Sequence, residues 1–406
     1  MASVPFTARA LKTAPPVPPA VPGTRLRLGF ACAWDANPLQ TWSQTPWHLR
    51  EALRRVADVV DLGIELPAAG RAALRLLHTR RWAGEFVSGW KHSRLWDTIC
   101  QQTLNPRARR SSVAAVLEIQ DMASVEVPFF LYQDASYDVL LHLWQTGTQR
   151  LPHFPMLDLD TIRRRAERQH RIFAQASGIL AMSAWYARTL TQWSGVPAEK
   201  VHVVHPGMNA VTRRHVRLRP APRRRLLLVG KDFHTKGGDV VLAALARLRR
   251  DLDPQISLTV AGPRRWPVDG SIPDGVRFLG RLPVADVGAL YDSHDLLVMP
   301  SRFEAFGIAF VEALASGLPC IGRRAFAMPE LITPGRNGDL VDDDDPEKLA
   351  ACIARTLADD GLYRRCQSEA ASVAAHFTWD RAAADTLAAV ASSLTRLGGA
   401  RLESTA

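Results

Sequence analysis

The sequence has few cysteines and no long apolar segment. Its five cysteines are scattered over 406 residues without a CxxC pair or a neighbouring histidine cluster. This pattern indicates neither a disulfide scaffold nor a zinc module. The longest apolar runs, such as 226–229 and 309–311, are far shorter than the roughly 20 residues of a membrane-spanning helix. We therefore expect no transmembrane helix, and cysteines packed as small apolar side chains in a reducing cytoplasm.

The overall composition is that of a globular protein. Hydrophobic residues make up 47% and charged residues 22% of the chain, which excludes wholesale disorder. At this length a single hydrophobic core is improbable, so we expect two domains. Residues 1–24 are rich in proline and lack the continuous apolar stretch of a secretory signal, which predicts a flexible leader.

Acidic residues are the scarcer charged class, and the imbalance is uneven. The net charge is +11, and residues 1–200 hold 24 Lys and Arg against 16 Asp and Glu, together with nine of the eleven tryptophans. Such a surface suits an anionic partner, although a solvated arginine-rich surface explains it equally well. No recognised module surrounds the basic cluster at 107–110, so we predict no nucleic-acid partner.

Short apolar strands alternate with helical segments along most of the chain. A strand at 25–31 is followed by an amphipathic helix at 46–60, and the alternation restarts after a basic, proline-containing stretch. This order is typical of parallel sheets covered on both faces, with ligands at the carboxyl ends of the strands. The predicted parts are a leader at 1–24, a first domain at 25–210, a linker at 211–225, a second domain at 226–376, a helix at 377–396 that packs back toward the first domain, and a tail at 397–406.

The strongest motif runs from Pro300 to Pro319, where a strand ends in a tight turn and a helix begins near Phe306. The free N–H groups at such a helix start suit a phosphate. Glu304 precedes the helix and Glu312 lies within it, up to about 12 Å apart at 1.5 Å per residue. This span matches the two ends of a nucleotide-sugar. The neighbours of Glu312 are apolar, and an unpaired carboxylate is costly there, so we interpret both glutamates as ligand-binding.

A second loop lies between an apolar strand at 226–229 and a helix at 239–249. Lys231 and Lys236 stand in this glycine-flanked loop, where two ammonium groups can neutralise a diphosphate. The loop is neither a P-loop nor a GxGxxG fingerprint. By themselves two such lysines are more often solvated surface, but together with the glutamate motif they favour a nucleotide-sugar site.

With these motifs in this order, the sequence resembles the retaining glycosyltransferases of family 4, also called glycosyl transferases group 1. The resemblance is close over 178–390 and loose over 25–177. It implies the GT-B fold, in which two Rossmann-like domains with doubly wound parallel sheets face each other across a cleft. The segments that carry it are 230–237, 278–280 with 290–291, 304–312, and 377–379 at the start of a final helix.

The resemblance also implies roles for individual residues. Glu304 would contact the donor sugar, Glu312 the ribose, and the two loop lysines the departing diphosphate. The amides of Gly307 and Ile308 would contact the distal phosphate. The predicted donor-binding set is Gly230, Lys231, Lys236, Phe306, Gly307, Ile308 and Glu312. Glu304, Lys236 and Asp134 form the predicted catalytic set.

Asp134 follows an apolar strand at 128–132 in the first half of the chain. We interpret it as a polar contact to the donor sugar or to an acceptor hydroxyl. A helix N-cap is the alternative interpretation.

The function implied is a metal-independent retaining hexosyltransferase without a cofactor. Its substrates would be a UDP- or GDP-sugar and a glycan or lipid-linked acceptor, in cytoplasmic synthesis of surface polysaccharide or glycolipid. Two departures from the family pattern favour an alternative, a catalytically degenerate GT-B subunit that binds sugar-nucleotide or a partner enzyme: Lys231 stands where the family has arginine, and the loop at 41–46 lacks glycine. A third departure, the segment at 322–330 that is not glycine-rich, bears on the identity of the donor.

Residues 71–96 combine arginines and lysine with leucine, phenylalanine and tryptophan. We predict a basic helix that could lie on an anionic membrane surface, at the inner face of the membrane, and reach a lipid-linked acceptor. A core-packed helix with a solvated basic face explains the segment equally well.

Overall fold

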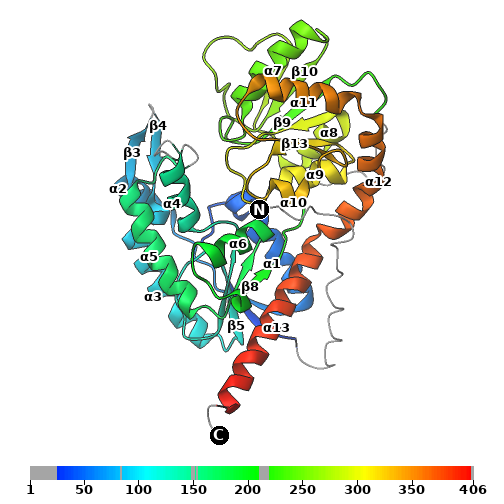
Figure 1. Cartoon of the computed structure of the whole chain (residues 1–406). Coiled ribbons are helices and arrows are strands. Elements are labelled where there is room, and N and C mark those ends of the chain that lie inside the picture. The colour runs from blue at the N-terminus through cyan, green and yellow to red at the C-terminus, as the bar shows by residue number, and fades with distance from the viewer. Residues whose placement is uncertain (1–24, 83–84, 148–150, 152–153, 210–218, 404–406) are drawn as a thin grey trace. The chain divides into compact units, whose positions relative to one another are not determined.

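The computed structural model describes residues 25–82, 85–147, 151, 154–209 and 219–403. Its contacts divide the chain into two compact units, one up to Gly207 together with Trp379 onward, the other from Met208 to Thr378. Each unit is built on a six-stranded sheet (Figure 1). The predicted pair of doubly wound α/β domains is confirmed. The predicted leader and most of the predicted linker lie outside the described residues.

The first sheet is entirely parallel, with strand order β2-β1-β5-β6-β7-β8. All residues of β5, β6 and β7 are buried, as expected for central strands covered by helices on both faces. The strands are β1 (Arg27–Ala31), β2 (Asp58–Asp61), β5 (Ala115–Ile119), β6 (Phe129–Gln133), β7 (Gly178–Ala181) and β8 (Val201–Val203).

Helices cover both faces of this sheet. Leucines, tryptophans and isoleucines of α3, α5 and α6 form one core with the strands, and α1 packs with α13 on the other side. The helices are α1 (Thr45–Val56), α2 (Ala68–Leu77), α3 (Arg94–Arg110), α4 (Tyr137–Thr146), α5 (Leu159–Gln175), α6 (Ala184–Gln192) and α13 (Trp379–Glu403), with 3-10 turns at Pro38–Gln44, Trp90–His92 and Ala198–Lys200.

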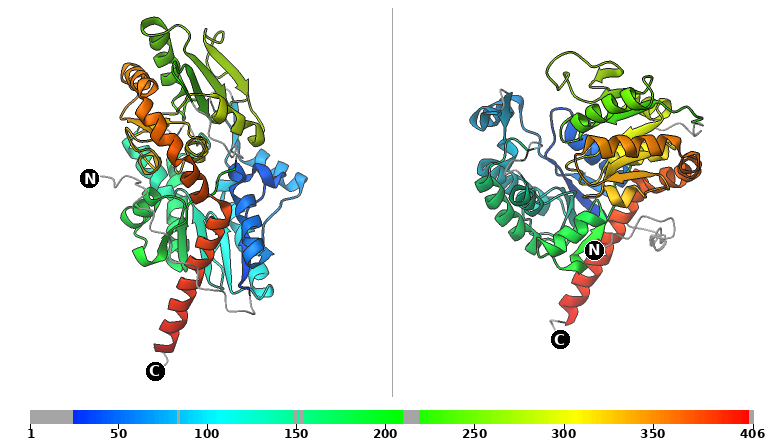
Figure 2. Two further views of the ribbon diagram at one scale, coloured as in Figure 1. Left: turned by 90° about the vertical axis from the view of Figure 1, so that its right-hand side faces the viewer. Right: turned by 45° about the horizontal axis from the view of Figure 1, so that its top comes forward.

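The last helix, α13, belongs to the first unit although it follows the second in sequence. Arg381 donates to the carbonyl of His205 at 2.7 Å, and Ser393 lies 3.2 Å from Nε2 of His202. A Cβ on Gly207 would fall 2.5 Å from the backbone nitrogen of Trp379, so glycine permits this close approach. Figure 2 shows α13 in red, with its C-terminal end extending past the sheet.

The second sheet is also parallel, with strand order β11-β10-β9-β12-β13-β14. This is the Rossmann arrangement, in which the chain runs outward from the middle in one direction and then in the other. The strands are β9 (Arg225–Val229), β10 (Ser257–Ala261), β11 (Val276–Gly280), β12 (Leu296–Val298), β13 (Cys320–Arg323) and β14 (Gly338–Val341).

Two helix layers cover the second sheet. The pair α7 and α11 shares an aliphatic core with the strands on one face, and α8, α9 and α10 lie on the other, where α12 packs on α9. The helices are α7 (Gly238–Asp251), α8 (Val284–Ser293), α9 (Ile308–Ala315), α10 (Met328–Leu331), α11 (Pro346–Ala358) and α12 (Asp360–His376). Among the described helices, none combines the length and apolarity that crossing a membrane requires.

The prediction of one basic helix over 71–96 is wrong. The segment holds the end of α2, an antiparallel hairpin of β3 (Thr79–Trp82) and β4 (Glu85–Ser88), a 3-10 turn and the start of α3. Arg80 and Val87 face each other across this hairpin. Glycines at 84 and 89 and the β-branched Thr79 and Val87 agree better with turns and strands than with a helix.

Arg219 is a buried cation in the second unit, only 3% exposed. Its guanidinium donates to the carbonyls of Tyr291 and His294 at 2.8 Å each, and to those of Gly317 at 2.9 Å and Ser316 at 3.2 Å. These carbonyls lie at the C-terminal ends of α8 and α9, where backbone acceptors lack intrahelical partners and the helix dipole favours positive charge. One side chain therefore ties two helix ends together.

We expect Arg219→Met to lower the free energy of unfolding by about 3 kcal/mol or more, because several buried carbonyls lose their donor. Urea unfolding followed by circular dichroism measures this. Arg250→Met is the matched control, since its exposed guanidinium pairs with the adjacent Asp251, and it should leave the stability nearly unchanged. Equal losses in the two variants would contradict the prediction.

Candidate functional site

The order of the second sheet reverses between β9 and β12. In open α/β sheets the crevice outside the carboxyl ends of the strands at such a point is where ligands bind. The loop after β9 carries the two lysines, and the loop after β12 carries Glu304. The two strongest sequence motifs therefore meet at this one position.

Lys236 and Glu304 are in direct contact there. The ammonium Nζ donates to Oε2 of Glu304 at 2.6 Å, and Oγ of Ser301 lies 3.3 Å from the same oxygen. Both charged side chains are largely buried, at 17% and 12% exposure, which strengthens a charge-assisted hydrogen bond. A Cβ on Gly230 would fall 2.6 Å from Cγ of Lys236, so glycine at the end of β9 leaves room for the lysine stem.

Arg302 fastens the two loops together. Its guanidinium donates to both carboxylate oxygens of Asp239 and to Asp344, each at 2.8 Å, and its backbone N–H donates to the carbonyl of Thr235 at 2.8 Å. Burial alone would raise the pKa of Asp239, but the hydrogen bonds from Arg302 hold it below its ordinary value. The carboxylate therefore stays ionised and the clamp stays closed at neutral pH.

Sequence reasoning missed Arg302 and its two carboxylate partners. The backbone bond from Arg302 to Thr235 and the bridge to Asp344 join residues far apart in the chain, and no local spacing marks them. The sequence does contain four consecutive aspartates at 342–345. In the structure Asp345 caps α11, while Asp344 also pairs with Arg323 at the end of β13.

Glycines in left-handed conformation shape both loops. Gly237 has φ of 73°, and a Cβ there would fall 2.7 Å from the carbonyl oxygen of Pro300. Gly307 has φ of 99° and precedes the first residue of α9, Ile308. The first N–H groups of α9 have no acceptor within the helix, so this end of the helix favours an anion. The Phe306 side chain is buried beside the ring of Phe377. Only the backbone of Phe306 is therefore available to contact a ligand.

Glu312 is 5% exposed and lies on α9, beyond its first turn. The hydroxyl of Tyr291 donates to its Oε2 at 2.9 Å, and the backbone N–H of Asn209 donates to its Oε1 at 3.0 Å. Burial, and then the Glu312 carboxylate, raise the pKa of Tyr291 well above its ordinary value, so the tyrosine remains a donor. These two bonds, to the two oxygens of one carboxylate, fix the orientation of Glu312.

The other predicted residues lie in two places. Lys231 is an exposed residue of the same loop as Lys236. Asp134 belongs to the first unit, where it directly follows β6 and its Oδ1 lies 3.4 Å from Nε2 of Gln120. The N-cap of α4 is Ser136, which accepts from the N–H of Val139, so Asp134 does not have that role. The catalytic and binding roles of these residues stay predictions.

The loop after β1 in the first unit lacks the glycines typical of the family. Instead Trp42, Ser43 and Gln44 are three consecutive residues with φ of 38°, 55° and 67°, immediately before α1. Left-handed backbone is unfavourable for residues with a Cβ. The chain therefore retains a glycine-like conformation here without glycine.

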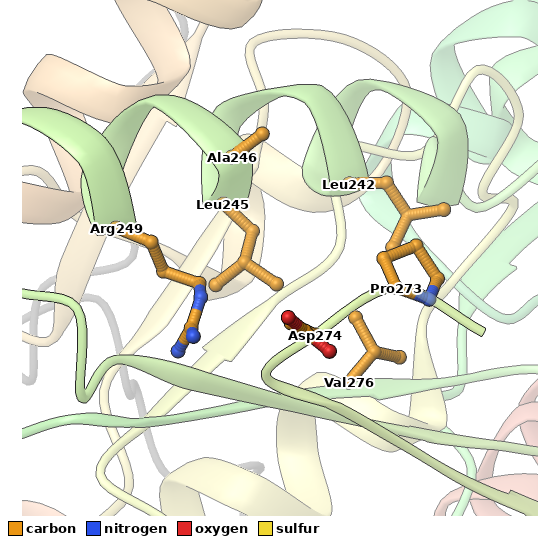
Figure 3. Close-up of a pocket in the computed structure, with 7 residues that line it drawn as sticks. All are labelled: Leu242, Leu245, Ala246, Arg249, Pro273, Asp274 and Val276. Atoms are coloured by element: carbon orange, nitrogen blue, oxygen red, sulfur yellow. The ribbon is translucent and has the colours of Figure 1, made fainter.

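A separate pocket lies between α7 and the segment that leads into β11 (Figure 3). Its volume is about 200 Å³, and aliphatic side chains share the lining with Arg249 and Asp274. None of the predicted site residues lines it. Among the residues that the structure describes, no group of three or more His, Cys, Asp or Glu side chains could hold a metal ion.

Residues 212–373 match the family model described as "Glycosyl transferases group 1". The D-inositol 3-phosphate glycosyltransferase of Streptomyces bingchenggensis is 31% identical over 243 residues, which cover 54% of this chain and 53% of that protein. The MMP alpha-(1->4)-mannosyltransferase of Mycolicibacterium hassiacum is 30% identical over 240 residues, covering 57% and 58%. The chain thus spans about half the length of the curated relatives it matches.

Two solved structures share the fold over most of the chain. A sucrose-phosphate synthase from Thermosynechococcus elongatus superposes with a TM-score of 0.68 at 17% identity. The match covers 92% of this chain and 100% of the synthase chain. Anabaena Alr3699/HepE in complex with UDP and glucose gives 0.60 at 16% identity, covering 90% and 99%. Together with the two parallel sheets, these matches establish the GT-B fold, and residues 212–373 are similar to the glycosyl transferases group 1 family.

Proposed function

We propose that this protein is a retaining, metal-independent hexosyltransferase that uses a UDP- or GDP-sugar. The observation that carries the proposal is the meeting of Lys236 with Glu304 at 2.6 Å at the reversal point of the second sheet, followed by the buried Glu312 on α9. The acceptor would be a glycan or a lipid-linked sugar, in surface-polysaccharide or glycolipid synthesis at the cytoplasmic side. The names of the relatives, an inositol-phosphate glycosyltransferase and a mannosyltransferase, support the reaction class.

The reaction breaks the bond between the sugar C1 and the diphosphate, and forms a bond from C1 to the acceptor oxygen on the same face. The acceptor proton passes to an oxygen of the departing diphosphate. Negative charge builds on that group, and the positive charges of Lys231 and Lys236 and the amides of Gly307 and Ile308 would stabilise it. Asp134, from the first unit, would contact the donor sugar or the acceptor hydroxyl.

The Lys236–Glu304 pair has a defined part in this scheme. Without a ligand each side chain neutralises the other, which limits the cost of holding two charges in a largely buried place. A diphosphate would draw the Lys236 ammonium toward itself. The Glu304 carboxylate would then accept hydrogen bonds from sugar hydroxyls, while Glu312 would accept from the ribose diol.

We expect Glu312→Ala to weaken nucleotide binding by tenfold or more, because the ribose loses a pre-oriented charged acceptor. Thermal shift with UDP and GDP measures this, since a ligand that binds the folded state raises Tm. Tyr291→Phe should weaken binding less, because Asn209 still orients the carboxylate. Glu347→Ala is the control, with an exposed side chain on α11. Binding unchanged in Glu312→Ala would contradict the ribose assignment.

We expect Glu304→Gln to lower the rate of hexosyl transfer about 10²-fold while nucleotide binding persists, since the lost interaction is with the reacting sugar. Release of UDP or GDP from a panel of nucleotide-sugars, with and without acceptor, gives the rate. Lys236→Met should lower both the rate and the affinity for the diphosphate. Equal activity in wild type and Glu304→Gln would contradict the assignment.

The second candidate function is a catalytically degenerate subunit that binds sugar-nucleotide or a partner enzyme. The replacement of arginine by Lys231 and of the first-loop glycines by Trp42–Gln44 favours it. The same assay separates the two, because this candidate binds nucleotide with Glu312-dependent affinity and turns over no donor in the panel.

A further inference from the structure

The three most exposed large apolar side chains gather on one part of the first unit. Leu76 and Leu77 at the end of α2 are 80% and 71% exposed, and Phe86 on β4 is 78% exposed. The other exposed large apolar side chains of the described chain reach at most 58%. Figure 1 shows α2, β3 and β4 together at an edge of the first unit.

The helix α2 is almost uncovered. Leu74 alone of its ten residues is buried, and the exposed remainder consists mostly of alanine and leucine. A ten-residue helix is marginal in water without tertiary packing. An outward-facing apolar helix beside an exposed phenylalanine is typical of a surface that binds another protein or a membrane.

The charges around these side chains are mostly positive, with Glu85 next to Phe86 in β4 as an exception. No aspartate or glutamate occurs from Leu66 to Gly84, while four arginines do. Arg81 pairs with Phe86 in the hairpin register, so the two side chains lie on the same face. Arg75 is exposed on α2 beside Leu76. Arg80 differs, because it donates to the carbonyl of Pro155 at 2.9 Å and pairs with Asp158.

We propose that Arg71, Arg75, Leu76, Leu77, Arg81 and Phe86 form a docking surface for an anionic lipid bilayer. The leucines and the phenylalanine would enter the boundary between headgroups and acyl chains, with α2 parallel to the membrane. The arginines would bind lipid phosphates while their stems lie along the apolar region. A net positive rim of arginines around aliphatic and aromatic side chains complements such a bilayer in both charge and polarity. This binding is independent of the proposed glycosyl transfer.

The surface lies within the segment 71–96 that the sequence predicted, but it does not include Trp90. Trp90 is buried, 7% exposed, and packs edge-on against Trp96 in the core of the first unit. It therefore cannot reach a membrane while the unit is folded. The exposed apolar side chains lie before Trp90 in the chain, on α2 and the hairpin.

Vesicle flotation of the full chain tests the proposal, with vesicles of phosphatidylcholine alone and of phosphatidylcholine with about one-third phosphatidylglycerol. We expect the wild type to float with the anionic vesicles, less so as salt rises. The variant L76S/L77S/F86S should lower the partition coefficient at least tenfold. R75Q/R81Q should lower it by about fivefold for each arginine and reduce the salt dependence.

The control L252S/R250Q changes an exposed leucine and an exposed arginine of the second unit, and should float as the wild type does. Unchanged Tm and an unchanged thermal shift with nucleotide show that each variant is folded. No flotation of the wild type with anionic vesicles, or equal flotation of L76S/L77S/F86S, would overturn the proposal. Sedimentation velocity supplies a further test. Self-association that this triple variant abolishes would assign the surface to a second copy of the chain and also overturn it.

Discussion

The ion-pair clamp centred on Arg302 is the interaction on which the candidate site depends. Its guanidinium bridges Asp239, at the start of α7, to Asp344, in the loop after β14, and Asp344 in turn pairs with Arg323. A parallel sheet places the carboxyl ends of all its strands at one edge. The loops at that edge have no ladder of their own, so side-chain charges hold them in position. Lys236 and Glu304 meet because this clamp fixes the loops that carry them.

A chain of buried hydrogen-bonded groups also stabilises the site within the same unit. Arg219 binds the carbonyl of Tyr291, the hydroxyl of Tyr291 binds Glu312, and Glu312 is also held by the backbone of Asn209. Each group would be costly to bury alone, and each is stabilised by the next. The packing of α8 against α9 therefore helps to fix the orientation of the Glu312 carboxylate. The predicted basic linker ends in residues that belong to this core, since Arg219 and Arg223 are both buried.

The first unit combines a well-packed sheet with two costly surface features. The left-handed Trp42, Ser43 and Gln44 store conformational strain directly after β1. The uncovered α2 and the hairpin expose apolar area instead of burying it. Both features lie at the surface, while the buried residues of the sheet and its packed helices account for the stability of the unit. Backbone strain and exposed apolar area of this kind are tolerated where the rest of the domain is well packed and stable.

The residue pattern alone predicted the two α/β domains, the two loops that carry Lys236 and Glu304, and the helix that carries Glu312. These features follow from local signals: apolar strands, glycines at strand ends, and a helix start after a turn. The short edge strand β2 was read as the end of a helix, because Val59 and Val60 fit either periodicity. Arg302, Arg219, Tyr291 and Asn209 acquired their roles through contacts between segments far apart in the chain. No local spacing encodes such contacts, because they exist once the sheet order has brought the loops and helix ends together.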